Sequence, residues 1–399
     1  MNQRIQPVLA TIPQDIVSTF DYKKYADTML PFPVLEYING GVADDITLKK
    51  NTSQFESIHI YNRVLNDFSS PSTQCTLFSG SHQKTLSHPI LLAPVAHQSL
   101  VHPEAELASA QAAHALNTPM IVSTLASKTL EDIAQHSNDL WFQLYWQPSR
   151  KDNLALLNRA INASYGAIVI TLDAPVSGLR NRAQRAGFVL PKKININLSP
   201  EMLFPQTNAH ANDQLGAQTQ SPENTAKVLN SNDSIVLDGF MSDAPTLDDL
   251  IWLRQQTHLP LIAKGISHPD DALRLKEIGF DGIVVSNHGG RQLDGAMSSI
   301  SALPAILDAV GDKIEVHMDG GIRSGQDVLK AVAMGAKGTY IGRSAIYGLG
   351  AMGEEGVTTA LNVIHKELDI TMALCGKRDV NDLDRDILLI PKDFGGNWV

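Results

Sequence analysis

Short apolar runs alternate with longer amphipathic segments along the chain from about residue 90 onward. Most of the runs are continuously apolar rather than alternating, which is typical of strands buried on both faces. The intervening segments, such as residues 102–116, 149–164 and 267–280, read as amphipathic helices. The sequence therefore predicts repeated strand–helix units, with strands in residues 90–94, 119–123, 140–145, 167–173, 260–265, 282–288, 314–321 and 338–342.

The number of these units predicts the fold class. Parallel strands joined by right-handed helical crossovers form an open doubly wound sheet or a closed barrel, and eight units of similar spacing favour closure. We therefore expect an α/β protein with a (β/α)8 TIM barrel, as a single domain over residues 1–399. Residues 1–89 would form an N-terminal helical cap with a small hairpin, residues 90–345 the barrel, and residues 346–399 C-terminal helices and a tail.

One stretch interrupts the rhythm between the fourth and fifth predicted strands. Residues from about 174 to 245 form a long insertion whose middle is rich in Asn, Gln, Ser and Thr. Long loops in compact domains are often active-site lids or disordered segments. This one follows the carboxyl end of a barrel strand, where barrel enzymes build their active sites, so we expect a lid.

Composition excludes several classes of protein. With 43% hydrophobic and 19% charged residues, the chain can bury a large core. A formal net charge of −10 and the lack of a basic stripe argue against nucleic-acid binding. No stretch is apolar enough for a signal peptide or a membrane span, and Cys75 and Cys375 have neither disulfide nor metal spacing. A cytoplasmic protein without a metal site is the expectation.

Polar residues gather at the carboxyl ends of the predicted strands. Each alone has an ordinary explanation, such as an Asp that caps the next helix or a Lys whose stem covers apolar surface. In a barrel, however, all these ends meet at one mouth, and charges directed into one pocket must be paired or bind a ligand. The residues concerned are Ser123, Gln143, Tyr145, Thr171, Asp173, Lys264, His288, Arg291, Asp319, Arg323, Gly342 and Arg343.

Two glycine-rich loops predict an anion site. "DGGIRSG" (319–325) and "IGRS" (341–344) follow the seventh and eighth strands, where barrels often bind phosphate. Glycine lets backbone N–H groups approach the anion and arginine can bind it with two hydrogen bonds, so a sugar phosphate or a flavin phosphate would fit. A third motif, "GLGAMG" (348–353), matches the dinucleotide fingerprint but follows no strand directly, so helix packing or a bend is expected there.

These motifs together resemble one family. "SNHGGRQLDG" (286–295), with "PLIAKGI", "DGGIRSGQDVLKAVAMGA", "IGRSAIYGL", "WFQLYW" and "TLDAPVSGLRNR", resembles the FMN-dependent L-2-hydroxy acid oxidases and dehydrogenases, which include glycolate oxidase and lactate oxidase. The likeness spans roughly residues 33–388 and looks closest to the lactate oxidase branch. It implies FMN as cofactor, a homotetramer, and oxidation of an L-2-hydroxy acid to the 2-oxo acid. Electrons would pass from FMN to oxygen or a quinone-type acceptor.

The resemblance also implies catalytic and substrate-binding roles. His288 would be the active-site base, because imidazole readily exchanges a proton near neutral pH. Asp173 would hold the imidazole and stabilise its protonated form. The substrate carboxylate would be bound by guanidinium groups and the substrate hydrogen-bonded by phenols, the residues being Arg180, Arg291, Tyr37 and Tyr145.

Further residues would bind the cofactor. Lys264 would lie at the N1/O2 edge of the flavin and stabilise negative charge on the reduced ring. The ring, ribityl chain and phosphate would be contacted by Pro94, Val95, Ala96, Ser123, Gln143, Thr171, Ser286, Asp319, Gly320, Gly321, Arg323, Gly342 and Arg343.

Departures from the family pattern bear on the substrate. Val95 stands where plant glycolate oxidases have threonine, and Leu125 replaces an aromatic residue that lines the substrate pocket in better-known members. Loss of the aromatic ring permits a 2-hydroxy acid bulkier than glycolate or lactate. His97 lies near the same pocket, and both a packing role and a functional role fit it.

Two other functions stay open at this point. A barrel enzyme of another class, such as a flavin-dependent isomerase or a sugar-phosphate lyase, would explain the phosphate loops but not the arginines assigned to a carboxylate. A non-catalytic flavin or metabolite sensor would leave the set of His288, Arg291 and Asp173 without a role.

Overall fold

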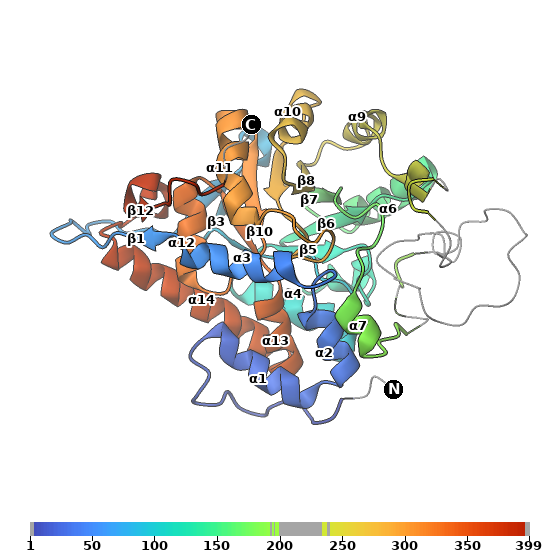
Figure 1. The fold of residues 1–399 in the computed structure, drawn as a ribbon, viewed down its shortest axis with the longest axis horizontal. Coiled ribbons are helices and arrows are strands. Elements are labelled where there is room, and N and C mark those ends of the chain that lie inside the picture. Colours follow the sequence, from blue (N-terminus) through green and yellow to red (C-terminus); the bar gives the residue numbers. More distant parts are fainter. Residues whose placement is uncertain (1–3, 192–193, 195, 199–233, 238–239, 396–399) are drawn as a thin grey trace, which may run out of the picture.

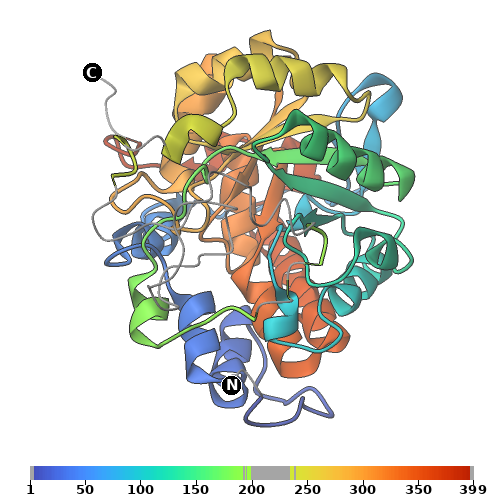
Figure 2. The same ribbon diagram turned by 90° about the vertical axis from the view of Figure 1, so that its right-hand side faces the viewer.

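Eight parallel strands form a closed barrel at the centre of the molecule (Figures 1 and 2). The computed structural model describes residues 4–191, 194, 196–198, 234–237 and 240–395. The strands follow one another around the barrel in chain order, and the last pairs with the first. The predicted barrel is confirmed, and each predicted run overlaps one strand: β4 (Ile90–Leu92), β5 (Met120–Ser123), β6 (Leu140–Tyr145), β7 (Ala167–Thr171), β8 (Leu261–Ile266), β9 (Gly282–Val285), β10 (Glu315–Asp319) and β11 (Gly338–Ile341).

Helices cover the outside of the barrel and account for the burial of the strands on both faces. Every residue of β5, β7, β9 and β11 is buried. Several helices start at side-chain caps: the hydroxyls of Thr246, Ser298 and Ser324 each accept a hydrogen bond from a backbone N–H of the first turn. The covering helices are α4 (Glu106–Ala115), α5 (Leu130–Ile133), α6 (Arg150–Asn162), α9 (Leu247–Gln255), α10 (Pro269–Glu277), α11 (Ser299–Val310), α12 (Gly325–Met334) and α14 (Glu354–Leu374), which lies between α12 and α4.

The segments outside the barrel units add helices and two small sheets. Antiparallel pairs are formed by β2 (Cys75–Leu77) with β3 (Lys84–Leu86), and by β1 (His59–Ile60) with β12 (Leu388–Leu389). The added helices are α1 (Thr19–Met29), α2 (Phe32–Asn39), α3 (Ile46–Glu56), α7 (Asn181–Arg185) and α13 (Arg343–Met352), which packs on α1 and α14. Short 3₁₀ turns cover Gly80–His82, Gln98–Leu100, Phe240–Asp243, Gly311–Lys313, Val380–Asp382 and Arg385–Ile387.

The "GLGAMG" motif lies within and just after α13, as the helix-packing interpretation predicts. Gly348 faces Gly356 of α14 so closely that a Cβ on Gly348 would lie 2.3 Å from the Gly356 carbonyl oxygen. Its glycines therefore allow two helices to pack, and the motif does not form a strand-to-helix turn.

The predicted lid lies largely outside the described residues, because residues 199–233 are not among them. Before that part, α7 is tied to the N-terminal helices: Arg182 pairs with Glu36 at 2.6 Å and with Asp45 at 3.2 Å.

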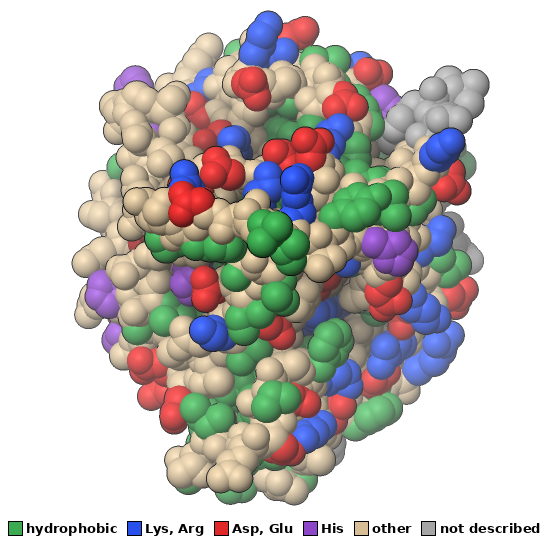
Figure 3. All heavy atoms as spheres, turned by 90° about the vertical axis from the view of Figure 1, so that its left-hand side faces the viewer, with side chains coloured by type: hydrophobic (Ala, Val, Ile, Leu, Met, Phe, Trp, Pro, Cys, Tyr) green, Lys and Arg blue, Asp and Glu red, His purple; other side chains and the backbone are tan. Residues whose placement is uncertain are grey.

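Acidic and basic side chains are interspersed on the face shown in Figure 3. Among the described helices, none has the length and apolar character needed to cross a bilayer.

Candidate active site

A pocket opens where the barrel strands end, and it collects most of the predicted site residues. Its wall includes side chains from six strands or the loops after them, together with α2. The predicted residues that line it are Tyr37, Pro94, Val95, Ala96, Tyr145, Lys264, His288, Arg291, Asp319, Gly320, Gly321, Arg323, Gly342 and Arg343.

The turn after β9 places His288 and Arg291 at this pocket. His288 and Gly290 both have positive φ, 58° and 74°. At Gly290 a side chain would also collide, because an added Cβ would lie 2.6 Å from the backbone of Leu48. The preceding Asn287 exchanges two amide hydrogen bonds with Asn51 of α3, of 2.8 and 2.7 Å. The turn is therefore fixed against an N-terminal helix.

His288 stands between a carboxylate and a phenol. Its Nδ1 lies 3.0 Å from Oδ1 of Asp173, and the Tyr145 hydroxyl lies 3.3 Å from its Nε2. Burial raises the pKa of Asp173, but the charge and hydrogen bond of His288, with the charge of Lys264, outweigh burial and leave that pKa below its ordinary value. Asp173 is thus an ionised acceptor, which places the proton on Nδ1 and leaves Nε2 as the basic nitrogen.

A glycine makes the approach of Asp173 possible. Gly265 follows Lys264 with φ of 99°, and a Cβ there would lie 2.5 Å from the Asp173 side chain. Any other residue at this position would displace the carboxylate from His288.

Lys264 lies inside the barrel mouth with a carboxylate partner. Its Nζ is 3.0 Å from Oδ2 of Asp319 and donates to the Ser286 hydroxyl at 3.0 Å. Burial lowers the pKa of Lys264, but Asp319 and Asp173 outweigh burial and raise it above its ordinary value. Lys264 is therefore a fixed positive charge. Oδ1 of Asp319 is buried and accepts no hydrogen bond from the described residues.

Arginines crowd the other side of the pocket. Burial, followed by the charges of Arg291, Arg323 and Arg180, lowers the pKa of Arg343 to about 9, with the nearby Tyr347 acting in the opposite direction. Burial also lowers the pKa of Arg323. Crowded, desolvated cations of this kind require a bound anion or dense hydrogen bonding.

Backbone carbonyls at the end of α2 supply part of that compensation. Arg343 donates from Nε to Ile38 O at 2.8 Å, from Nη2 to Gly40 O at 3.0 Å and from Nη1 to Gly289 O at 3.0 Å. Arg291 donates to Tyr37 O at 2.7 Å, and its guanidinium carbon lies 4.9 Å from the centre of the Tyr37 ring. Both arginines are thus attached to the C-terminal end of one helix.

The donor set fits FMN. Its phosphate would meet Arg323 and the first turn of α13, where the Ser344 hydroxyl is buried without a hydrogen-bond partner among the described residues. Its ribityl hydroxyls would find an acceptor in Oδ1 of Asp319. Its reduced ring would find a positive charge in Lys264.

Other predicted residues lie behind or beside the pocket lining. Across β5, β6 and β7, Ser123 donates to Gln143 at 3.0 Å and Gln143 to Thr171 at 2.9 Å, which forms one hydrogen-bonded row. Leu125 is buried, and its carbonyl accepts from the backbone of His97 at 3.1 Å. Arg180 precedes α7, and its charge reaches Arg343.

The structure adds residues that the sequence did not single out. Phe188 stacks on Tyr37, with ring centres 4.3 Å apart and an interplanar angle of 13°. Tyr340 of β11 lines the pocket from inside the barrel. His97, which the sequence already placed near the pocket, lines it as well. No sequence motif marks Phe188 or Tyr340, because the residues that they contact lie far away along the chain.

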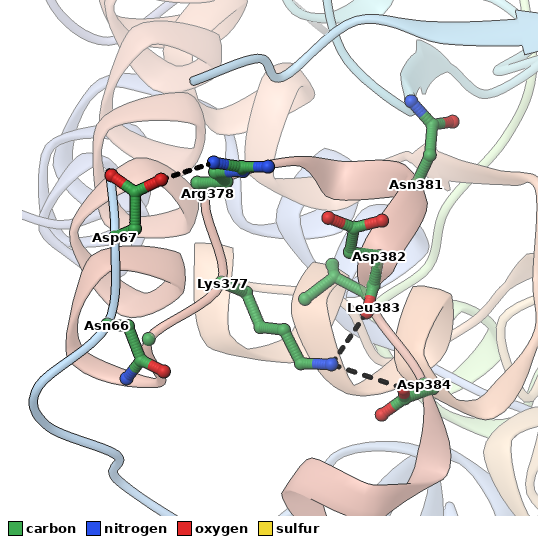
Figure 4. A pocket seen from close by; sticks show the side chains of 9 residues that line it. Asn66, Asp67, Lys377, Arg378, Asn381, Asp382, Leu383 and Asp384 are labelled. Carbon is green, nitrogen blue, oxygen red and sulfur yellow. Dashed lines mark hydrogen bonds and ion pairs between the residues drawn. The ribbon is translucent and has the colours of Figure 1, made fainter. Parts of the chain in front are cut away.

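A second hollow lies on the surface between residues 66–67 and 376–384 (Figure 4). Its two cationic groups are already paired: Lys377 donates to Asp382 O at 2.7 Å and lies 3.1 Å from Asp384, and Arg378 lies 2.9 Å from Asp67. We therefore place the functional site in the barrel mouth.

Comparison with known proteins agrees with this geometry. The family model described as FMN-dependent dehydrogenase matches residues 26–390. An L-lactate oxidase from Nostoc sp. is 40% identical over 93% of this chain and 98% of its own length, and 2-hydroxyacid oxidase 1 of Homo sapiens is 34% identical over 92% and 95%. The crystal structure of mandelate oxidase with (S)-2-phenylpropionate superposes with a TM-score of 0.79 at 36% identity, covering 94% of this chain and 98% of that one.

Proposed function

The chain belongs to the FMN-dependent dehydrogenase family and is an FMN-dependent oxidoreductase for 2-hydroxy acids; on that premise we propose that it oxidises an L-2-hydroxy acid of lactate size or larger to the 2-oxo acid. The observation that carries the proposal is the position of His288 and Arg291 on one rigid turn. Asp173 is hydrogen-bonded to His288, and the ring of Tyr37 lies against the guanidinium group of Arg291. This arrangement provides a base and a carboxylate-binding group at a fixed separation.

The residues of the site have separate roles in substrate binding and proton transfer. Arg291 and Arg180 bind the substrate carboxylate, and the phenols of Tyr37 and Tyr145 orient the substrate. Nε2 of His288 accepts one of the two protons that the substrate loses, and Asp173 stabilises the imidazolium that results. FMN, when bound, would supply the acceptor for the two electrons and the second proton.

Lys264 contributes a permanent positive charge beside the cofactor. Because Asp319 and Ser286 hold its Nζ, the charge does not reorient during the reaction. Arg323 and the first turn of α13 hold the phosphate.

The size of the substrate follows from Leu125 and Val95. Leu125 is an aliphatic residue at a position where an aromatic ring would narrow the pocket, and its carbonyl oxygen accepts a hydrogen bond from the backbone of His97. A substrate side chain of one or more carbons therefore fits better than the hydrogen of glycolate. As part of the same proposal, oxygen is the electron acceptor and the protein is a cytoplasmic homotetramer.

An anaerobic substrate panel tests the reaction. The purified protein with FMN is mixed with glycolate, L-lactate, L-2-hydroxybutyrate and L-mandelate in a stopped-flow instrument, and the loss of the flavin absorption band is recorded. We expect faster loss with the acids larger than glycolate. A flavin that no member of the panel reduces would indicate a non-catalytic role, and a preparation that binds no FMN would overturn the placement of the cofactor.

The acceptor and the catalytic roles need separate measurements. Reoxidation of the reduced enzyme by air-saturated buffer should outpace reoxidation by a soluble quinone; the opposite order would assign a dehydrogenase. The His288→Gln and Asp173→Asn variants should still bind FMN, but substrate should reduce the bound FMN about 10²- to 10⁴-fold more slowly than in the wild type. Near-normal reduction in both variants would contradict the assigned roles.

A further inference from the structure

Three titratable side chains lie one above another on the inner face of β10. Glu315, His317 and Asp319 alternate along this strand, so they share one face, and Asp319 is the one that reaches Lys264. Barrel interiors are normally filled with branched apolar residues. Here His317 is fully buried in the interior, and neither the base nor the carboxylate-binding residues contact it.

His317 is hydrogen-bonded at both ring nitrogens. Its Nε2 lies 3.0 Å from Oε2 of Glu315, and its Nδ1 lies 2.8 Å from the hydroxyl of Tyr340. Glu315 as a carboxylate accepts from the Nε2–H of His317, and Nδ1 then serves as the acceptor for the phenolic proton of Tyr340. The three residues thus form a directed line of hydrogen bonds from the start of β10 to β11.

The surroundings leave the imidazole no other position. Gly338 of β11 is the strand partner of His317, and a Cβ there would lie 3.4 Å from Cγ and Nδ1 of the imidazole. The rings of Trp141 and Phe78 lie 6.2 and 6.3 Å from its centre. Phe78 also donates its backbone N–H to Glu315. The Glu315 end of the line is therefore held as well.

Tyr340 connects this line of hydrogen bonds to the pocket. It is the strand partner of Asp319 and lines the same cavity as Lys264 and Asp319. Burial, together with the negative charges of Asp319 and Glu315, raises the pKa of Tyr340 well above its ordinary value. Tyr340 is therefore a neutral donor, and its proton is directed to His317 and not to Asp319.

We propose that Glu315, His317 and Tyr340 are positioning residues for the cofactor. They fix the Tyr340 phenol in the pocket wall and keep its proton on His317, so that Oδ1 of Asp319 stays available as an acceptor for a ribityl hydroxyl. The inference rests on the proposed placement of FMN in this pocket. None of the three residues takes part in proton transfer from the substrate.

The test is the affinity and spectrum of bound FMN. Apoprotein of the wild type, Tyr340→Phe, His317→Phe and the double variant is titrated with FMN, and the dissociation constant and the visible absorption band are measured. Loss of one such hydrogen bond should weaken FMN binding about three- to tenfold and shift the band. Because the two residues act as one unit, the double variant should bind no more weakly than the weaker single variant.

Matched controls separate this role from simple packing. Tyr165→Phe removes another buried phenol, which donates to Leu130 O at 3.1 Å outside the site, and should lower the melting temperature without changing FMN affinity. Glu315→Gln should weaken FMN binding in the same direction as His317→Phe. The inference is overturned if the Tyr340 and His317 variants bind FMN like the wild type while Lys264→Met does not. If Lys264→Met also leaves FMN unaffected, the placement of the cofactor fails instead.

Discussion

The stack of Phe188 on Tyr37 predicts a measurable effect on substrate binding. Tyr37 lies between Phe188, with ring centres 4.3 Å apart, and the Arg291 guanidinium, 4.9 Å from the ring centre. The phenol is therefore held by one ring and one cation, which enter from the segment after β7 and from the turn after β9. Phe188→Leu removes the ring but keeps an apolar side chain against Tyr37.

The size of the effect follows from the geometry. An offset or parallel aromatic pair contributes about 0.5–1.5 kcal/mol beyond its buried area. A free energy of about 1.4 kcal/mol corresponds to a factor of ten in an equilibrium constant. If the pair holds Tyr37 against the substrate, loss of the pair should therefore raise KM about two- to twelvefold. The proton acceptor His288 is untouched, so kcat should change less than twofold, as expected when binding is lost equally from ground and transition states.

A double-mutant cycle decides whether Phe188 acts through Tyr37. Steady-state oxygen consumption with the best substrate gives KM and kcat for Phe188→Leu, Tyr37→Leu and the double variant, with Phe188→Tyr as the control that keeps the ring. In the Tyr37→Leu background, Phe188→Leu should add nothing to KM. Additive effects, or a fall in kcat with an unchanged KM, would refute the reasoning.

Three further predictions concern the charged groups. Lys264→Met should lower the reduction potential of bound FMN, measured against a reference dye, and an unchanged potential would place the flavin elsewhere. The same variant should lower the free energy of unfolding by about 3 kcal/mol or more, because Asp319 is left buried without its cation. The folded-state pKa of Asp173 is depressed, so its contribution to stability is complete above the unfolded-state pKa of about 4 and is lost as pH falls through the folded-state pKa. Urea titrations should accordingly show that Asp173→Asn loses less unfolding free energy than the wild type between about pH 5 and pH 3, and equal losses would contradict the pairing. Inorganic phosphate should raise the melting temperature of the apoprotein more than chloride at equal ionic strength, and Arg323→Met should abolish the difference; the same rise in the variant would exclude Arg323 as the phosphate ligand.

The barrel could be predicted because its strands are buried on both faces. Such strands are continuously apolar, and the runs that contain β5 and β7 are readable without any knowledge of their neighbours. Their carboxyl ends meet at one mouth in every closed barrel, so His288 and Lys264 could be assigned to one pocket from chain position alone.

Contacts between distant segments could not be predicted in the same way. Phe188 stacks on a ring more than a hundred positions earlier in the chain, and nothing in its local sequence marks it. His317 stands in an apolar run where its hydrogen bonds to Glu315 and Tyr340 depend on the register of β10 with β11. Local patterns specify which residues face inward, but only the pairing of strands specifies which side chains meet.

The position of Arg343 shows the same limit within a recognised motif. "IGRS" predicts a phosphate-binding arginine, and Arg343 does line the pocket, but its guanidinium donates to carbonyls of Ile38, Gly40 and Gly289. Carbonyls at a helix C-terminus carry partial negative charge and lack partners within the helix. The end of α2 therefore compensates part of the charge that Arg343 and Arg291 bring together, and it joins both to the turn that carries His288. The N-terminal helices are therefore a component of the candidate site, because the carbonyls at the end of α2 accept hydrogen bonds from both arginines.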